Sequence, residues 1–153
     1  MSRRNIVAVG AFERDNFGDF LFYEVLKRFN AKDNIVPSSV IYSDMDNSYG
    51  IRTIPYDFLL NNYTVDAIWV VGGEVGSVSV LDAAKMSLPN DMIARANSNN
   101  FLPDESVLAI EISLGANPKN SYAYIPDISL YEKNKNTPLI VTSVGLSTSS
   151  KEV

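Results

Sequence analysis

Continuous apolar runs and stretches of helical periodicity alternate along most of the chain. The apolar run at residues 6–12 stops at Glu13, which is typical of a strand covered on both faces of a sheet. Residues 20–30 then alternate between an apolar and a solvated face, as an amphipathic helix does. The same reasoning predicts strands at 34–43, 51–54, 66–71 and 138–144, and helices at 55–61, 78–87, 90–96 and 128–135. This alternation predicts an α/β fold with a parallel sheet, right-handed crossovers and helices on both faces.

Two polar segments between the early elements carry their own expectations. In the strand at 34–43, Pro37 is expected at the start and residues 39–42 in the paired part. The polar segment at 44–50 predicts a surface loop. Its two carboxylates, two residues apart, would suit a cation loop, but the glycine and terminal glutamate of a calcium loop are missing. The strand at 51–54 is expected at an edge of the sheet.

The later part of the chain is less regular. Residues 106–113 fit either a strand or a helix, and periodicity does not decide between them. Residues 115–126 predict irregular backbone, because Gly, Pro and Asn recur there. The tyrosines in and after this segment either pack the loop down or stack on a sugar face; they are Tyr122, Tyr124 and Tyr131.

The turn Asn16-Phe17-Gly18-Asp19 lies between the first strand and the first helix. Gly18 suits a backbone angle or a close approach that a side chain would forbid. Asp19 is placed to cap the helix by accepting hydrogen bonds from its first-turn amides. The turn is either only a capped connection or a ligand site, since a helix start offers free amides and partial positive charge.

A glycine pair, Gly72-Gly73, follows the strand at 66–71. It lacks the lysine and spacing of a P-loop and is not a dinucleotide fingerprint. The pair either only tightens the turn or brings bare backbone to a ligand, with Glu74 beside it. Because parallel strands share one carboxyl edge, this turn and the turn at 13–19 are expected to lie side by side there.

Composition excludes several classes of function. The chain has no cysteine and no histidine, which removes disulfides, Cys-based metal sites and Ser-His or Cys-His catalysis. The net charge is −5 with no basic stripe, so no nucleic-acid partner is expected. With 153 residues, 46 % of them hydrophobic, the chain fits one globular domain. The apolar run after Arg4 is too short for a signal peptide or a membrane span, so a cytoplasmic protein is the default expectation.

Three segments resemble polysaccharide pyruvyl transferases and occur in that family's order. Gly10-Ala11-Phe12, followed by residues 16–21 (NFGDFL), is similar to the family's first strand, N-x-G-D turn and helix. Residues 67–74 (AIWVVGGE) resemble its apolar strand ending in a glycine pair or triplet. Residues 138–145 (PLIVTSVG) resemble its strand running into a V-G turn.

This resemblance implies a transferase of polysaccharide biosynthesis that moves a pyruvyl group from phosphoenolpyruvate to a sugar hydroxyl. Such enzymes look like two-domain, GT-B-like proteins with the active site between two Rossmann-like halves. The chain would be the first half, a single Rossmann-like domain over 1–153, with 146–153 as linker or disordered tail. The second half would hold most of the donor through Arg and His, so this half is expected to be inactive alone.

The resemblance also implies site residues. Asp19 and Glu74 would be the catalytic candidates, taking a proton from the attacking hydroxyl. The residues that would face the cleft and bind substrate are Asn16, Phe17, Gly18, Gly72, Gly73 and Gly145. No metal and no cofactor is expected, and the partners would be the sugar acceptor and phosphoenolpyruvate.

Two other interpretations remain open at this stage. The chain could be a non-catalytic module that binds a sugar or nucleotide-sugar, or half of a GT-B-like glycosyltransferase. The sequence leaves open the acceptor, the donor, the oligomeric state, and whether the chain is a truncated or a natural stand-alone unit. An apolar edge left by a missing half makes homo-oligomers plausible.

Overall fold

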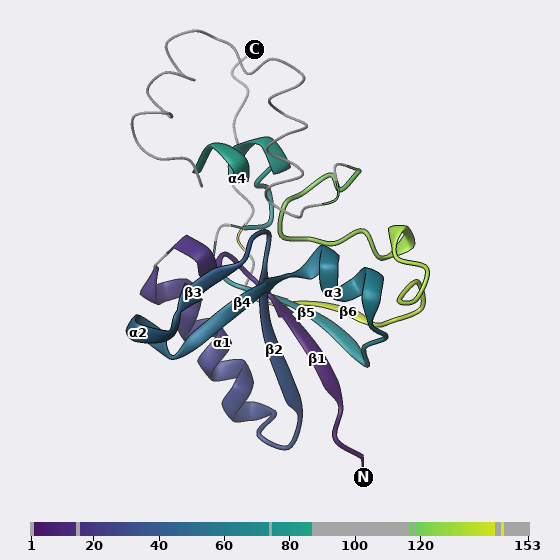
Figure 1. Cartoon of the computed structure of the whole chain (residues 1–153), viewed down its shortest axis with the longest axis horizontal. Helices are drawn as coiled ribbons and strands as arrows, with labels where there is room; N and C mark the ends of the chain where they lie inside the picture. Colours follow the sequence, from purple (N-terminus) through teal and green to yellow (C-terminus); the bar gives the residue numbers. More distant parts are fainter. Residues whose placement is uncertain are drawn as a thin grey trace, which may run out of the picture.

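The computed structural model (Figure 1) describes residues 2–14, 16–73, 75–86, 117, 119–142 and 145. The described residues form an α/β structure around a six-stranded sheet. Its strands are β1 (Asn5–Val9), β2 (Asn34–Ser39), β3 (Ser43–Met45), β4 (Ile51–Pro55), β5 (Ala67–Val71) and β6 (Leu139–Thr142). The helices are α1 (Phe17–Phe29), α2 (Asp46–Tyr49), α3 (Tyr56–Asn62) and α4 (Val80–Met86), with 3-10 turns η1 (Phe12–Arg14) and η2 (Ile128–Leu130). The predicted elements at 90–96 and 106–113 and the tail at 146–153 lie outside the described residues.

The strand order is β3-β4-β2-β1-β5-β6, and every pair is parallel except β3 with β4. The chain therefore starts in the middle of the sheet with β1, extends it on one side through β2 and β4, and then crosses to β5 and β6. This is the order of a doubly wound sheet, in which ligands bind where the strand order reverses. Here that position is the carboxyl end of β1 beside the carboxyl end of β5. The predicted parallel α/β sheet is confirmed.

The two longer early helices cover opposite faces of the sheet (Figure 1). Neighbouring residues of β1 point to opposite faces, as a strand requires. Ala8 packs with Tyr23 of α1 in one apolar cluster, whereas Val7 packs with Tyr56 and Leu60 of α3 in the other. The prediction that helices lie on both faces is thus confirmed for α1 and α3.

Pro37 lies inside β2 rather than at its start, and the paired part is residues 34–39 instead of 39–42. The backbone N–H of Asn34 donates to the carbonyl of Arg4, which precedes β1. Because successive residues of a strand face alternate sides, the amides of the even-numbered residues of β2 point toward β1. Pro37 is therefore on the β4 side, where pairing begins only at Ser38. A proline is tolerated there because no ladder hydrogen bond is lost.

The segment predicted as a polar loop contains β3 and the short helix α2. Asp44 and Asp46 both pair with Arg52 of β4, at 3.2 Å and 3.0 Å. Arg52 thus pairs with one carboxylate of β3 and one of α2. In the strand order β3 is the edge strand and β4 is an inner strand, so the prediction that residues 51–54 form an edge strand is wrong.

The described part of the segment at 115–126 is irregular backbone, as predicted, and a buried polar network connects it to α3. Tyr56 Oη donates to the Ala123 carbonyl at 2.7 Å, and Asn120 Nδ2 donates to Tyr56 Oη at 2.9 Å. Tyr124 and Tyr131 are fully buried, so they pack the loop down and do not offer a sugar-stacking face. The helix predicted at 128–135 is only the 3-10 turn η2 followed by further turns.

Candidate functional site

The first turn of α1 begins three residues earlier than the sequence predicts. Asn16 is the N-cap, and its Oδ1 accepts from Gly18 N at 2.9 Å. The Phe20 amide closes the first helical hydrogen bond to the Asn16 carbonyl at 3.2 Å. Asp19 therefore does not cap the helix; it lies within the first turn, because the Asn16 side chain already fills the capping position.

Asp19 instead links the turn of α1 to the turn after β5. Its Oδ1 accepts from Gly73 N at 3.3 Å, and its Oδ2 accepts from Asn16 Nδ2 at 3.1 Å. The carboxylate is almost fully buried by these contacts. The two turns predicted to share one edge of the sheet are thus in direct contact, at the point where the strand order reverses.

The third segment of the family resemblance, residues 138–145, also contacts the turn after β5. Gly145 N donates to the Gly73 carbonyl at 2.7 Å, and Gly76 N donates to the Gly145 carbonyl at 3.2 Å. Gly145 follows β6, the strand beside β5. A series of hydrogen bonds, from Asp19 to Gly73 and from Gly73 to Gly145, therefore connects all three segments that resemble the pyruvyl transferase family.

Close approach and backbone conformation require glycine at two positions of this edge. A Cβ on Gly10 would lie 2.7 Å from Phe12 Cζ and 2.8 Å from the Val71 carbonyl oxygen, so β1 could not pass β5 as it does. Gly72 has φ 131°, a conformation that L side chains rarely adopt. Gly18 needs neither: its φ is not positive, and a Cβ there would meet only Asn16 Oδ1, at 3.3 Å.

The predicted substrate-binding residues differ in accessibility. Asn16, Phe17 and Gly18 are exposed, Gly73 is half-buried and Gly72 is buried. An approaching ligand would therefore meet the first turn of α1 and the Gly73 backbone. Glu74, the second catalytic candidate, lies outside the described residues.

A buried carboxylate that the sequence analysis left aside lies beside this edge. Glu13, in η1, accepts hydrogen bonds from Ser39 Oγ and from Tyr124 Oη, and its side chain is 2 % exposed. Ser39 Oγ also reaches the Gly10 carbonyl at 2.8 Å. Burial raises the pKa of the Glu13 carboxyl above its usual range, although the hydrogen bonds from Ser39 and Tyr124 oppose the rise.

Arg14 adds a cation to the buried cluster of Glu13, Ser39 and Tyr124. Its Nη2 donates to Tyr124 Oη at 2.9 Å, and its guanidinium lies over the Tyr124 ring at 5.2 Å. Its Nε is buried, 3.8 Å from Glu13 Oε1, which is within ion-pair range but too long for a hydrogen bond. The sequence signal for this group was Glu13 at the end of a buried strand. Nothing local placed Tyr124, more than a hundred residues away, beside it.

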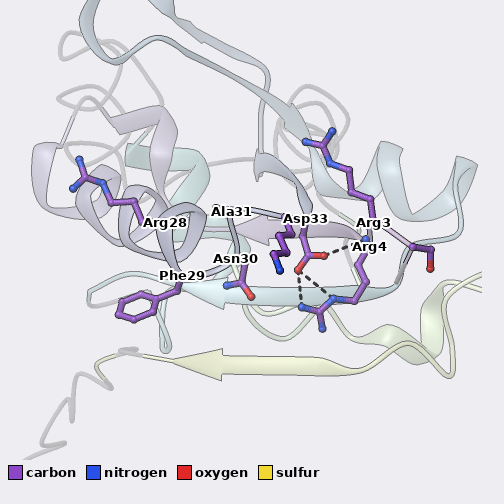
Figure 2. A pocket seen from close by; sticks show the side chains of 9 residues that line it. Arg3, Arg4, Arg28, Phe29, Asn30, Ala31 and Asp33 are labelled. Atoms are coloured by element: carbon purple, nitrogen blue, oxygen red, sulfur yellow. Dashed lines mark hydrogen bonds and ion pairs between the residues drawn. The ribbon is translucent and has the colours of Figure 1, made fainter.

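Two pockets lined by described residues lie away from this edge. One, of about 790 Å³, lies at the opposite, amino edge, where Arg3, Arg4 and Asp33 precede β1 and β2 (Figure 2). The other, of about 390 Å³, lies between α3 and the first residues of β1 and β2, beside Phe58 and Tyr63. Within the described part of the chain, no cluster of three or more carboxylate, histidine or cysteine side chains could hold a metal ion.

Comparison with protein-family models, with curated proteins and with solved structures gave no match for this chain. Across the residues that the structure describes, no helix is long and apolar enough to cross a membrane.

Proposed function

We propose that this chain is the first Rossmann-like half of a GT-B-like, polysaccharide pyruvyl transferase-like enzyme. In that role it would present an acceptor sugar to phosphoenolpyruvate, whose pyruvyl group is transferred to a sugar hydroxyl. The observation that carries the proposal is the hydrogen-bonded series Asp19–Gly73–Gly145. It unites the three family-like segments at the reversal point of a doubly wound sheet, where such folds bind their ligands.

The exposed first turn of α1 is the part of this edge that an acceptor sugar would contact. Asn16 keeps a second Nδ2 hydrogen and a second Oδ1 lone pair beyond its bonds to Asp19 and Gly18. Phe17, 64 % exposed, offers an aromatic face for the apolar side of a sugar ring. Asp19 holds this turn against Gly73 and so keeps the surface in place. Asp19 and Glu74 stay the predicted proton acceptors for the attacking hydroxyl.

The donor requires cations that this edge supplies sparingly. Arg14 is one, but its Nη2 already donates to Tyr124 Oη and its Nε is buried beside Glu13. Phosphoenolpyruvate carries a phosphate and a carboxylate, which proteins hold by several charge-assisted hydrogen bonds. We therefore expect the donor to be held mostly by a second half, and the chain alone to bind acceptor without turning it over.

A non-catalytic sugar or nucleotide-sugar binding module is the second candidate, and one observation favours it. Both carboxylate oxygens of Asp19 already accept hydrogen bonds, and the side chain is almost fully buried. A carboxylate held in this way suits positioning better than proton transfer, which requires contact with the reacting hydroxyl. Half of a GT-B-like glycosyltransferase would share the same edge and differ in its donor.

A thermal-shift panel separates these candidates, because a ligand that binds the native state raises the melting temperature. Free sugars, sugar nucleotides and phosphoenolpyruvate are tested separately against the chain and against Phe17→Ala. Phe58→Ala is the matched control, since Phe58 is 53 % exposed on α3, away from the edge. We expect a sugar to stabilise the chain and the Phe58 variant but not the Phe17 variant.

The donor arm of the panel then decides the class. Stabilisation by sugar nucleotides alone would support the glycosyltransferase half or the nucleotide-sugar module over the pyruvyl transferase. Rapid turnover of phosphoenolpyruvate with a sugar by the isolated chain would refute the half-enzyme proposal. No stabilisation by any member of the panel would count against a sugar site at this edge.

A further inference from the structure

An apolar stripe runs along the solvent side of α1. Phe17, Leu21, Val25 and Phe29 recur every fourth residue, and 64 %, 50 %, 44 % and 86 % of their surfaces are exposed. Residues four apart on a helix lie on one face, so these side chains form one ridge, whereas Tyr23 and Leu26 pack against the sheet. Single exposed apolar residues are ordinary, but a continuous row of large ones marks an interaction surface.

A basic cluster surrounds the C-terminal end of this stripe. Arg3, Arg28 and Lys32 line the amino-edge pocket together with Phe29, and these three cations form no ion pair with any described residue. Arg4 lies there too, but its guanidinium is held by Asp33 at 2.6 Å. Two carboxylates oppose these cations: Asp33, and Asp66, which accepts from Asn5 N at 2.7 Å. Four cations against two carboxylates leave the cluster an excess of positive charge.

The cations of the cluster do not converge on one point. Figure 2 shows Arg28 and Arg3 at opposite ends of the view, with the ring of Phe29 near Arg28 and directed away from Arg4 and Asp33. A compact anion such as a single phosphate needs donors aimed at one place. Spread cations around a protruding aromatic ring fit an extended anionic surface instead.

The aliphatic members of the stripe decide what kind of surface this is. Leu21 and Val25 have no aromatic face on which a nucleic-acid base could stack. A helix with an exposed apolar ridge and flanking Lys and Arg is typical of segments that lie in the interface of an anionic membrane. We infer that the α1 stripe and the basic cluster at its C-terminal end dock the chain on an anionic lipid surface.

The charge distribution selects the orientation of this docking. The chain as a whole carries −5, and the described residues 36–73 hold one Arg against four Asp. An anionic membrane therefore repels most of the molecule and attracts the α1 end. Docked in this way, the long axis of α1 lies along the membrane. Phe17 belongs both to this stripe and to the proposed acceptor surface, so the test below changes Leu21, Arg28, Phe29 and Lys32, which the proposed transferase function does not involve.

Vesicle co-sedimentation tests the inference with the full chain. The probes are vesicles of neutral phosphatidylcholine and vesicles that also contain phosphatidylserine, at low and high salt. We expect binding to the anionic vesicles, weakened by salt because exposed charges are screened. Arg28→Gln with Lys32→Gln is expected to weaken binding about tenfold or more, since each cation near an anionic surface contributes strongly. Leu21→Ser with Phe29→Ser is expected to abolish it.

Matched controls separate surface chemistry from folding. Phe58→Ser removes an aromatic side chain that is 53 % exposed on the other face, and Lys119→Gln removes a distant cation; both are expected to bind as the unaltered chain does. A melting curve for each variant verifies the fold. Absence of binding to anionic vesicles, equal binding to neutral ones, or dimerisation lost on changing Leu21 and Phe29 without any lipid binding would overturn the inference.

Discussion

Replacing Glu13 by Gln removes one ionisable group from the buried cluster at the carboxyl edge and nearly preserves its shape. Burial raises the pKa of Glu13 in the folded chain from its ordinary value of 4.5, so the folded state binds this proton more tightly than the unfolded state. Between the two pKa values unfolding releases a proton. The contribution of this proton to the unfolding free energy is therefore fully present below pH 4.5, and it is lost as the pH rises through the folded-state pKa.

The structure sets the size of the effect. At pH 4 the protonated Glu13 and Gln can both exchange hydrogen bonds with Ser39 and Tyr124, so the two proteins are expected to agree within about 1 kcal/mol. Above pH 4.5 the unaltered chain loses stability relative to Glu13→Gln. The loss proceeds at no more than about 1.4 kcal/mol per pH unit, the limit for one proton. The fall ends once Glu13 is ionised in both states.

Urea unfolding at a series of pH values measures this difference. Trp69, the one tryptophan, lies in β5 and donates from Nε1 to Thr142 Oγ1 at 2.9 Å, so its fluorescence reports the intact sheet. Burial also raises the pKa of Asp57, but that carboxyl is present in both proteins and its contribution cancels in the difference. A difference that is constant with pH, or that grows in favour of the unaltered chain above pH 4.5, would refute the assignment of Glu13.

Three further predictions concern the same edge and its support. Asp19→Ala removes the acceptor of the Gly73 amide and is expected to lower the unfolding free energy by about 1–3 kcal/mol in urea titrations. Gly72→Ala forces a side chain to φ 131° and is expected to cost about 1–3 kcal/mol, whereas Gly73→Ala, whose Cβ would lie 3.7 Å from Asp19 Oδ1, should cost less by the same assay. Tyr56→Phe leaves the buried Ala123 carbonyl without its donor and is expected to lower stability by about 1–3 kcal/mol, measured by thermal or urea unfolding.

The parallel arrangement of the central strands follows from local sequence. Uninterrupted apolar runs at β1 and β5, each followed by glycine and polar residues, are sufficient to predict parallel strands with turns on one edge. The contact between Asp19 and Gly73 confirms that expectation at atomic detail. The resemblance to pyruvyl transferases is not tested by this contact and stays a prediction.

Competing side chains and distant partners account for what the sequence did not predict. Asn16 and Asp19 are both good capping residues, and only the structure shows that Asn16 takes the cap while Asp19 turns to Gly73. Pro37 suggested a strand start, because the sequence does not reveal that β4 pairs with β2 only beyond it. The Glu13 cluster depends on Tyr124, which long-range packing brings to η1.

Amide chemical-shift mapping of the isotopically labelled chain, titrated with free sugars and sugar nucleotides, tests whether the turns after β1 and β5 form one ligand-binding edge. We expect the shifted amides to cluster at Gly18, Gly73 and Gly145. Shifts confined to the opposite edge, around Arg4 and Asp33, or no shifts with any sugar, would contradict it.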